Sequence, residues 1–269
     1  CPDEEMAEIA TAFLADFPFE SFDTAPTAEG TTLHAFILKE SWAECREEAL
    51  ATVADYGTVV SEEEIEDENW NERWEEESFS PVDIDNKIVI RAAHHPAPAD
   101  AVIDIIVKPS MSFGSGHHHT TRMMCRAIHS LNPSGRVLDV GCGTGVLSIA
   151  AIKCGAEHAD AVDIDPWSTA SAEEAAQLNG IAEQISVLLG TVEVVEGRKY
   201  DMVLANINRN IILNDIDRYV EALNEGGKLL LSGFLVEDIA DITTSASERG
   251  LCPIAQSEEE GWVCLVFKK

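Results

Sequence analysis

A glycine-rich turn is the feature of this sequence whose residue types and spacing are best suited to binding a cofactor. Residues 137–140 form an apolar, strand-like run that leads directly into the turn Gly-Cys-Gly-Thr-Gly at residues 141–145. Glycines at alternate positions let the chain turn tightly, and they let a ligand lie against the backbone without meeting Cβ atoms. Gly141, Gly143 and Gly145 are therefore predicted to contact a cofactor at the carboxyl end of this strand.

An acidic residue ends the next strand-like run, residues 159–163. A carboxylate in this place reaches the crevice of a doubly wound sheet, where it accepts hydrogen bonds from both hydroxyls of a ribose, so Asp163 is the ribose candidate. Its alternative role is a helix cap, but Asp165 fills that role better because Pro166 follows at the first helical position. The spacing G-x-G-x-G also differs from the dinucleotide pattern G-x-G-x-x-G, which disfavours NAD.

A third strand-like run, residues 201–205, leads into Asn206, Ile207 and Asn208. Together with the glycine turn and the acidic strand end, it predicts the S-adenosylmethionine crevice of a Rossmann-like methyltransferase. A methyl-accepting amine must be neutral and aimed, and an Asn oxygen accepts its hydrogen bond without adding a charge that favours ammonium. Asn206 is therefore predicted to be catalytic and to contact the cofactor. Asn208 is a second catalytic candidate, with helix capping as its alternative role. Asp139 is left open between supporting the turn and contacting the methionine end.

Residues 111–122 read as a glycine-containing loop that opens a helix, with the composition of a lid. Phe113 is predicted to cover an adenine or close the crevice, and Thr120 or Thr121 to hold the methionyl carboxylate near the positive helix end. Three consecutive histidines at residues 117–119 suggest a metal site. Adjacent side chains diverge, however, and no Cys or carboxylate cluster completes the site, so we expect no metal.

The elements that would position these residues follow an alternating pattern, which implies right-handed βαβ units and a parallel sheet covered on both faces. Parallel strands are expected at residues 137–140, 159–164, 185–189, 202–205 and 228–232. Two further strands, at residues 252–256 and 262–267, form an antiparallel hairpin at the sheet edge. The predicted fold is therefore α/β, with a Rossmann-like, doubly wound, mostly parallel sheet of seven strands and an antiparallel C-terminal edge hairpin.

The first part of the chain reads as a separate, small α+β domain over residues 1–61. Its helices are expected at residues 3–15 and 42–54, and its strands at residues 19–23, 33–38 and 58–60. Residues 62–110 read as an acidic linker with connecting strands at 82–84 and 87–91, which flank an Asp85-Asn86 turn. Residues 111–269 would then form the catalytic domain.

Composition narrows the class of protein. The 269 residues are 45% hydrophobic and 25% charged, which excludes wholesale disorder. A formal charge of −31 disfavours nucleic-acid binding, and residues 1–110 carry most of it, with 27 acidic and 6 basic side chains. No apolar run has the length of a membrane span, the start lacks signal-peptide features, and the seven cysteines form no C-x-x-C pair. We therefore expect a cytoplasmic protein; a lipidated Cys1 is the alternative.

The sequence resembles the bacterial ribosomal protein L-11 methyltransferases, in a form like that of Bacteroidetes, over nearly the whole chain. The segments that carry the resemblance are residues 69–71, 113–116, 118, 120–121, 137–145, 163–165 and 204–207. The resemblance implies that Thr121 (or Thr120), Gly141, Asp163 and Asn206 contact S-adenosylmethionine. It also implies that the N-terminal domain, expected to be ferredoxin-like, captures the ribosomal protein, and that the products are methylated lysine ε-amines and a methylated N-terminal α-amine.

Two segments depart from that family's usual pattern. Residues 117–119 are His-His-His where Thr-His-Pro is usual, and Asn208-Arg209 stands where Leu-Ala is more widespread. The departures bear on which amines are modified and how many methyl groups each receives. The predicted function is a monomeric protein-lysine N-methyltransferase. The alternatives are a methyltransferase for another protein or a small amine, a non-catalytic S-adenosylmethionine-binding ribosome-assembly module, and, third, an NAD dehydrogenase.

Overall fold

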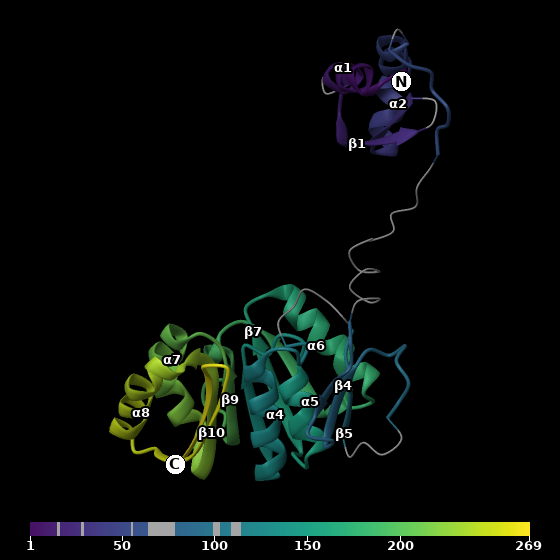
Figure 1. The fold of residues 1–269 in the computed structure, drawn as a ribbon. Coiled ribbons are helices and arrows are strands. Elements are labelled where there is room, and N and C mark those ends of the chain that lie inside the picture. The colour runs from purple at the N-terminus through teal and green to yellow at the C-terminus, as the bar shows by residue number, and fades with distance from the viewer. Residues whose placement is uncertain (15–16, 28–29, 55, 64–78, 99–102, 109–113) are drawn as a thin grey trace. The chain divides into compact units, whose positions relative to one another are not determined.

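The computed structural model describes residues 1–269 except 15–16, 28–29, 55, 64–78, 99–102 and 109–113. The chain divides into two compact units, Cys1–Glu68 and Asn69–Lys269 (Figure 1). The second unit holds all the residues that the sequence singles out for chemistry.

The N-terminal unit has the element order α-β-β-α. It comprises α1 (Glu4–Leu14), β1 (Phe19–Thr27), β2 (Gly30–Ile37) and α2 (Lys39–Val53), and the two strands pair antiparallel. This is the order of the four central elements in a ferredoxin-like β-α-β-β-α-β motif. The strand expected at residues 58–60 was wrong, because this segment has no regular secondary structure and pairs with no strand among the described residues. Its two valines are exposed, so no sheet face buries them.

The second unit is built on a seven-stranded sheet in the order β11-β12-β10-β9-β6-β7-β8. The strands are β6 (Arg136–Val140), β7 (His158–Asp163), β8 (Ile185–Leu189), β9 (Tyr200–Asn206), β10 (Leu223–Leu235), β11 (Cys252–Glu259) and β12 (Trp262–Lys268). Strands β6 to β10 run parallel, and β12 runs antiparallel to both of its neighbours. The predicted seven-stranded sheet with an antiparallel edge hairpin is confirmed. Within the hairpin β12 lies inside the sheet, and β11 forms the edge.

Helices cover both faces of this sheet (Figure 1). On one face lie α4 (His119–Leu131), α5 (Val146–Lys153) and α6 (Pro166–Leu178), and on the other α7 (Arg209–Ala222) and α8 (Ile239–Glu248). Short 3-10 turns occur at Ala182–Gln184, Val192–Val195 and Val236–Asp238. No helix among the described residues has both the length and the apolar character that a bilayer crossing needs.

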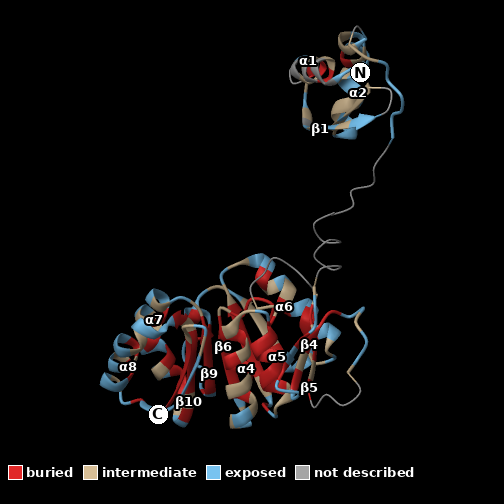
Figure 2. Ribbon diagram, viewed as in Figure 1, coloured by how far each residue is buried: buried red, intermediate tan, exposed pale blue. Residues whose placement is uncertain are grey.

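Side chains that alternate along the central strands pack into two separate hydrophobic cores, one on each face of the sheet. Val137 of β6 packs with the α4–α6 side, whereas Leu138 packs with the α7–α8 side, as expected for a strand buried on both faces. Figure 2 shows that the central strands are buried along most of their length. The sheet is therefore a rigid base, and the carboxyl ends of its parallel strands all meet at one edge.

A three-stranded sheet packs against the α4–α5 side of the second unit. It comprises β3 (Val82–Ile84), β4 (Ile88–Arg91) and β5 (Ile103–Ile106), with β3 antiparallel and β5 parallel to β4. The predicted turn at Asp85 and Asn86 is present, and both residues have positive φ. Ile88 and Ile90 are fully buried in the same core as α4 and α5, so these connecting strands share the core of the second unit.

A buried carboxylate anchors the amino-terminal edge of the large sheet. Asp160 is 1% exposed, and it accepts hydrogen bonds from Tyr200 at 2.6 Å, Arg136 at 2.9 Å and Arg198 at 3.1 Å. Burial alone would raise the pKa of this carboxyl, but the three hydrogen bonds together lower it below its ordinary value. Asp160 therefore remains charged in the folded protein.

We predict that Asp160→Asn lowers the free energy of unfolding by about 2 kcal/mol at pH 7, because the buried Tyr200 hydroxyl and two half-exposed arginines lose a charged hydrogen-bond partner. Since the folded pKa lies below the unfolded one, this stability is present above the unfolded pKa and is lost as the pH falls through the folded pKa. Urea unfolding at neutral and acidic pH measures the effect. The control Asp217→Asn removes an exposed pairing with Arg249 and should change little. Equal effects of the two variants would contradict the prediction.

Candidate functional site

The glycine turn lies at the carboxyl edge of the sheet and is fixed to the neighbouring strand. The backbone N–H groups of Gly141 and Cys142 donate to the carbonyl of Val162 in β7, at 2.8 and 3.1 Å. Gly141, Gly143 and Gly145 all have positive φ, as the alternating glycines predict. A Cβ on Gly141 would lie 2.3 Å from Cγ2 of Ile207, so only glycine fits where β6 and the β9 end approach each other.

Asp163 joins the end of β7 to this turn. Its carboxylate accepts hydrogen bonds from the backbone N–H groups of Gly143 at 2.9 Å and Asp165 at 3.0 Å. Asp165 in turn caps α6 by accepting from Trp167 N–H, with Pro166 at the first helical position, which confirms the predicted cap. The structure thus brings together the two predicted cofactor features, the glycine turn and the acidic strand end.

A second carboxylate, Asp139, lies fully buried beneath the turn. One of its oxygens accepts from the backbone N–H and the hydroxyl of Ser148 in α5, whereas Oδ1 has no partner among the described residues. Burial raises the pKa of Asp139 to about 6, the bonds from Ser148 oppose this, and the charge of Asp163 adds to it. Neither carboxylate pairs with a described Lys, Arg or His. The turn is therefore a site of negative potential, which suits a cationic ligand and repels a pyrophosphate.

The backbone of the turn offers little to an anion. The N–H groups of Gly141, Cys142, Gly143 and Gly145 all donate to protein oxygens, of Val162, Asp163 or Cys142. In a dinucleotide fold such groups face the pyrophosphate. The hydrogen bonding therefore agrees with the expectation from the glycine spacing that this crevice does not suit NAD.

Asn206 ends β9 beside the turn and is 8% exposed. Its Nδ2 lies 3.5 Å from the hydroxyl of Thr121, while its Oδ1 is buried without a partner among the described residues. The hydroxyl of Thr144, in the glycine turn, is also buried and unpartnered. A buried polar atom without a partner is costly, so oxygens left in this state beside a crevice indicate a ligand that completes their hydrogen bonds.

The first turn of α4 delivers the two predicted threonines to this place, and both are buried. His118 is the residue that caps the helix, and its Nδ1 lies 3.3 Å from Thr120 N and 2.7 Å from Thr120 Oγ1. Because the hydroxyl of Thr120 is engaged by His118, the hydroxyl that faces Asn206 is that of Thr121. The loop just before α4 also reaches the site: a Cβ on Gly114 would lie 2.8 Å from the Thr144 hydroxyl.

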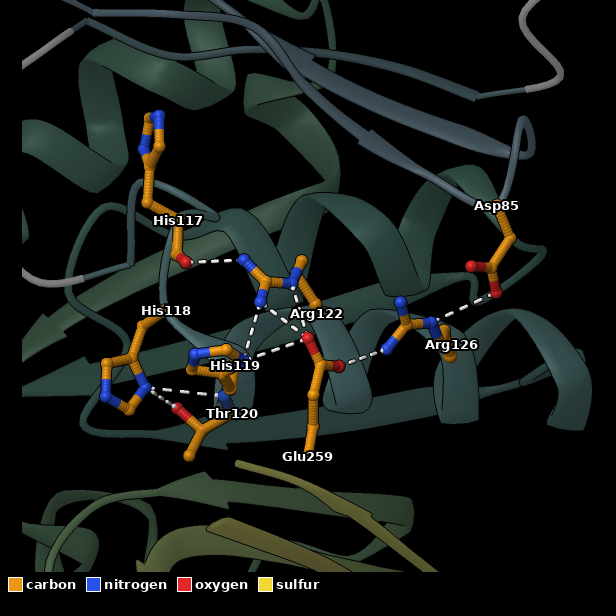
Figure 3. A network of polar contacts seen from close by, with 8 residues as sticks. All are labelled: Asp85, His117, His118, His119, Thr120, Arg122, Arg126 and Glu259. Atoms are coloured by element: carbon orange, nitrogen blue, oxygen red, sulfur yellow. Dashed lines mark hydrogen bonds and ion pairs between the residues drawn. The ribbon is translucent and has the colours of Figure 1, made fainter. Parts of the chain in front are cut away.

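The three consecutive histidines diverge, as the sequence predicts, and each engages a different partner (Figure 3). The His117 ring meets Phe79 edge-on at 4.9 Å, the His118 ring meets Trp262 at 4.7 Å, and His119 Nδ1 lies 2.9 Å from Glu259. Over the described parts of the chain, no group of three or more His, Cys, Asp or Glu side chains is arranged to hold a metal ion.

The remaining predicted site residues lie as follows. Phe113 falls outside the described residues. Asn208 is exposed and caps α7 by accepting from Ile211 N–H at 3.2 Å, which is the alternative role that the sequence left open. Cys142 is buried, and burial raises the pKa of its thiol well above the ordinary value, so it is no nucleophile.

Sequence reasoning did not assign three residues that the structure places at or near the site. Thr144 could have been found, since it lies within the glycine turn. Glu259 and Trp262 had no local signal, because they reach α4 from a hairpin more than 130 residues further along the chain. Both act on the start of α4 rather than on the turn.

We predict that the His118 cap makes α4 sensitive to acid. Burial first, and then the charges of His119 and Arg122, lower the pKa of His118 below its ordinary value. Protonation would turn Nδ1 from acceptor to donor, so the cap's contribution is present above the unfolded pKa and is lost as the pH falls through the folded pKa. The cap is worth about 1 kcal/mol.

Urea unfolding of wild type and two variants at neutral and mildly acidic pH measures this contribution. His118→Asn keeps a capping oxygen that does not titrate and should retain its stability, relative to His118→Ala, at both pH values. Wild type should resemble the Asn variant at neutral pH and the Ala variant in acid. A constant difference between wild type and His118→Ala would refute the prediction.

Comparisons with known proteins agree with this geometry. The family described as ribosomal protein L11 methyltransferase (PrmA) matches residues 15–269. The chain is 38% identical to the ribosomal protein L11 methyltransferase of Porphyromonas gingivalis, over 99% of this chain and 93% of that one. It is 36% identical to the protein of the same name from Bacteroides fragilis, over 98% of this chain and 94% of that one.

Among solved structures, the chain is similar to the ribosomal protein L11 methylase of Lactobacillus delbrueckii subsp. bulgaricus. The TM-score is 0.63 and the identity 28%, over 70% of this chain and 98% of that one. The family match over residues 15–269 includes the glycine turn, the acidic strand end and the β9 end. This chain therefore belongs to the ribosomal protein L11 methyltransferase family.

Proposed function

We propose that this protein transfers methyl groups from S-adenosylmethionine to amines of ribosomal protein L11, namely lysine ε-amines and the N-terminal α-amine. The observation that carries the proposal is the unpartnered Oδ1 of Asn206, buried at the strand end beside the glycine turn. An uncharged acceptor in this place suits a neutral amine better than it suits a hydride-transfer reaction.

The residues of the crevice fit S-adenosylmethionine. The cofactor carries a sulfonium and an ammonium but no phosphate, so the unpaired charges of Asp139 and Asp163 favour it. Asp163 retains lone pairs beyond its two backbone hydrogen bonds and can accept from ribose hydroxyls. Ile164, the next residue, is 70% exposed and offers an apolar surface to an adenine ring.

The protein's contribution to the reaction is to hold the amine and to keep it neutral. S-adenosylmethionine supplies an activated methyl group, and the amine must approach it with a free lone pair. Asn206 Oδ1 would accept one amine hydrogen and so point the lone pair toward the methyl group. Because the described residues beside Asn206 offer the amine no strong base, the proton released on transfer leaves to water. Asn208 stays a second candidate for contact with the amine.

We also propose that the N-terminal unit captures the protein substrate. This unit is acidic, and it exposes several apolar side chains: Phe13, Phe36, Leu38, Val59 and Val60. An acidic surface with apolar contacts is complementary to a lysine-rich protein. The division into a recognition domain (1–61), an acidic connection (62–110) and a catalytic domain (111–269) is part of this proposal. The cytoplasmic location and the monomeric state stay predictions.

We predict that Asn206→Ala lowers kcat about 100-fold, because a buried group aimed at the reacting amine is lost. Thermal melting should change much less, since the Asn206 side chain makes one long hydrogen bond to another described residue. The matched control is Asn210→Ala, an exposed residue four positions further along. Wild-type turnover by Asn206→Ala would refute its catalytic role.

The function itself is tested with purified protein, methyl-labelled S-adenosylmethionine and a ribosomal extract, followed by mass spectrometry of the labelled products. We expect label on lysines and the N-terminal amine of L11. Label on another protein or a small amine would replace the substrate assignment, and binding of the cofactor without any labelled product would indicate a non-catalytic module.

Removing residues 1–61 separates docking from chemistry in the same assay. We expect the shortened chain to bind S-adenosylmethionine, measured by calorimetry, and to lose methylation of the protein substrate. Methylation of L11 at the full rate would remove the proposed docking role while leaving the catalytic proposal intact.

A further inference from the structure

A second polar cluster lies at the start of α4, next to the crevice but not part of it. Glu259, at the end of β11, receives hydrogen bonds from Arg122 Nε at 3.1 Å and Nη2 at 2.5 Å, and from Arg126 Nη1 at 2.6 Å (Figure 3). Arg126 is bound in addition to Asp85 at 3.0 Å. One carboxylate thus spans two arginines that lie one helical turn apart on the same face of α4.

The cluster extends from the hairpin to the loop before the helix. Arg122 Nη1 donates to the backbone carbonyl of His117 at 2.6 Å, while the same guanidinium is held by Glu259. His117 ends the segment whose Gly114 backbone lies against Thr144 of the glycine turn. Glu259, Arg122 and the His117 carbonyl therefore form a continuous chain of hydrogen bonds to the backbone that borders the crevice.

The helix itself is oriented by the same contacts. Thr121, whose hydroxyl faces Asn206, directly precedes Arg122 in the first turn of α4. Because Arg122 and Arg126 are both fixed to Glu259, α4 can neither rotate nor slide without breaking charged hydrogen bonds. Rotation of the helix about its axis would move Thr121 away from Asn206.

The hairpin that carries Glu259 is well suited to act as a fixed point. Glu259 pairs with Trp262 across the turn, and Glu260 and Gly261 between them both have positive φ, which closes the hairpin tightly. Trp262 packs its ring against His118, the residue that caps α4. Both side chains that flank the turn thus contact the start of the same helix.

The electrostatics of the cluster favour a permanently charged carboxylate. Glu259 is 27% exposed, and burial alone would raise its pKa. The hydrogen bonds from Arg122, Arg126 and His119 outweigh burial and lower the pKa of Glu259 to about 2. The contact is therefore intact throughout the neutral range.

We propose that Glu259 is a positioning residue of the methyl-transfer site, which holds the first turn of α4 and the loop before it in the arrangement that binds S-adenosylmethionine. It acts through Arg122 and does not touch the reacting atoms. The inference rests on the proposed crevice but assigns a role to a residue outside it.

The test compares Glu259→Gln with Glu258→Gln. The first variant removes the charge that Arg122 and Arg126 share, and the second removes an equal charge from the preceding, exposed residue of the same strand. We expect Glu259→Gln to weaken calorimetric binding of S-adenosylmethionine, and to raise its KM, about tenfold, a usual size for coupling between sites. The KM for the protein substrate should not change. Glu258→Gln should match wild type in every measurement.

Hydrogen–deuterium exchange supplies a readout independent of activity. Peptides that cover residues 114–125 should exchange faster in Glu259→Gln than in Glu258→Gln, while peptides from β6 and β9 remain as protected as in wild type. Glu259→Asp keeps the carboxylate and should recover part of the affinity. Arg122→Lys keeps the charge but loses the planar fork that reaches both Glu259 and the His117 carbonyl, so it should reproduce the loss.

Wild-type affinity of folded Glu259→Gln for S-adenosylmethionine would overturn the proposal, and so would equal losses in the two Gln variants. If Glu259→Gln does not fold, Arg122→Lys serves as the test in its place. Wild-type affinity of Arg122→Lys for S-adenosylmethionine would then overturn the proposal. Failure of the wild-type protein to bind S-adenosylmethionine would instead refute the proposed function.

Discussion

The hydrogen bonds between the glycine turn and the end of β7 are the constraint on which the rest of the site depends. Gly141, Cys142 and Gly143 all donate to the last residues of β7, and Asp163 supplies the final acceptor. The turn is therefore held in place before any ligand binds, and the N–H groups of Gly141, Cys142, Gly143 and Gly145 are already hydrogen-bonded within the protein. What remains to attract a ligand is the negative potential of the two carboxylates. In dinucleotide-binding folds, the backbone amides of this turn bind phosphates. Here the negative carboxylates beside the turn favour a cationic ligand instead.

Three further segments are set against this fixed turn, each by a different kind of contact. Asn206 is placed by the sheet itself, because β9 pairs with β6 and its end is buried. Thr121 is placed by a helix whose start is capped by His118. The loop before that helix is placed by close backbone packing of Gly114 on Thr144. The sheet-borne residue is the most rigid of these, which suits a group that must aim an amine. The helix is held by its buried face and by the hydrogen bonds of Arg122 and Arg126 to Glu259.

Local sequence patterns correctly predicted the elements that depend mainly on neighbouring residues, namely strands and helix starts. Apolar runs of strand length gave all seven strands of the large sheet, and the Asp165-Pro166 pair gave the start of α6. The strand at residues 103–106 was missed, because no local turn joins it to β4 as Asp85-Asn86 joins β3 to β4, and its pairing with β4 depends on a core formed elsewhere. The strand expected at residues 58–60 lacks a partner, which no local pattern reveals. Glu259 and its arginines lie too far apart in sequence for any spacing rule to connect them. Gly141, Asp163 and Asn206 were accessible to sequence reasoning because each lies at the end of a strand, whereas Glu259 was not.

The position of β12 between β10 and β11 has a consequence for the order in which the protein folds. Strand β11 is synthesised before β12, yet among the described residues it pairs only with β12, and most of its residues are exposed. β11 therefore has nothing to pair with while it emerges, and the nascent chain must leave a gap beside β10 until β12 arrives. The start of α4 acquires its restraints from Glu259 and Trp262 only when the hairpin closes. During biosynthesis, the β11–β12 hairpin is therefore the last part of the sheet to form, and its formation completes the restraints on the start of α4.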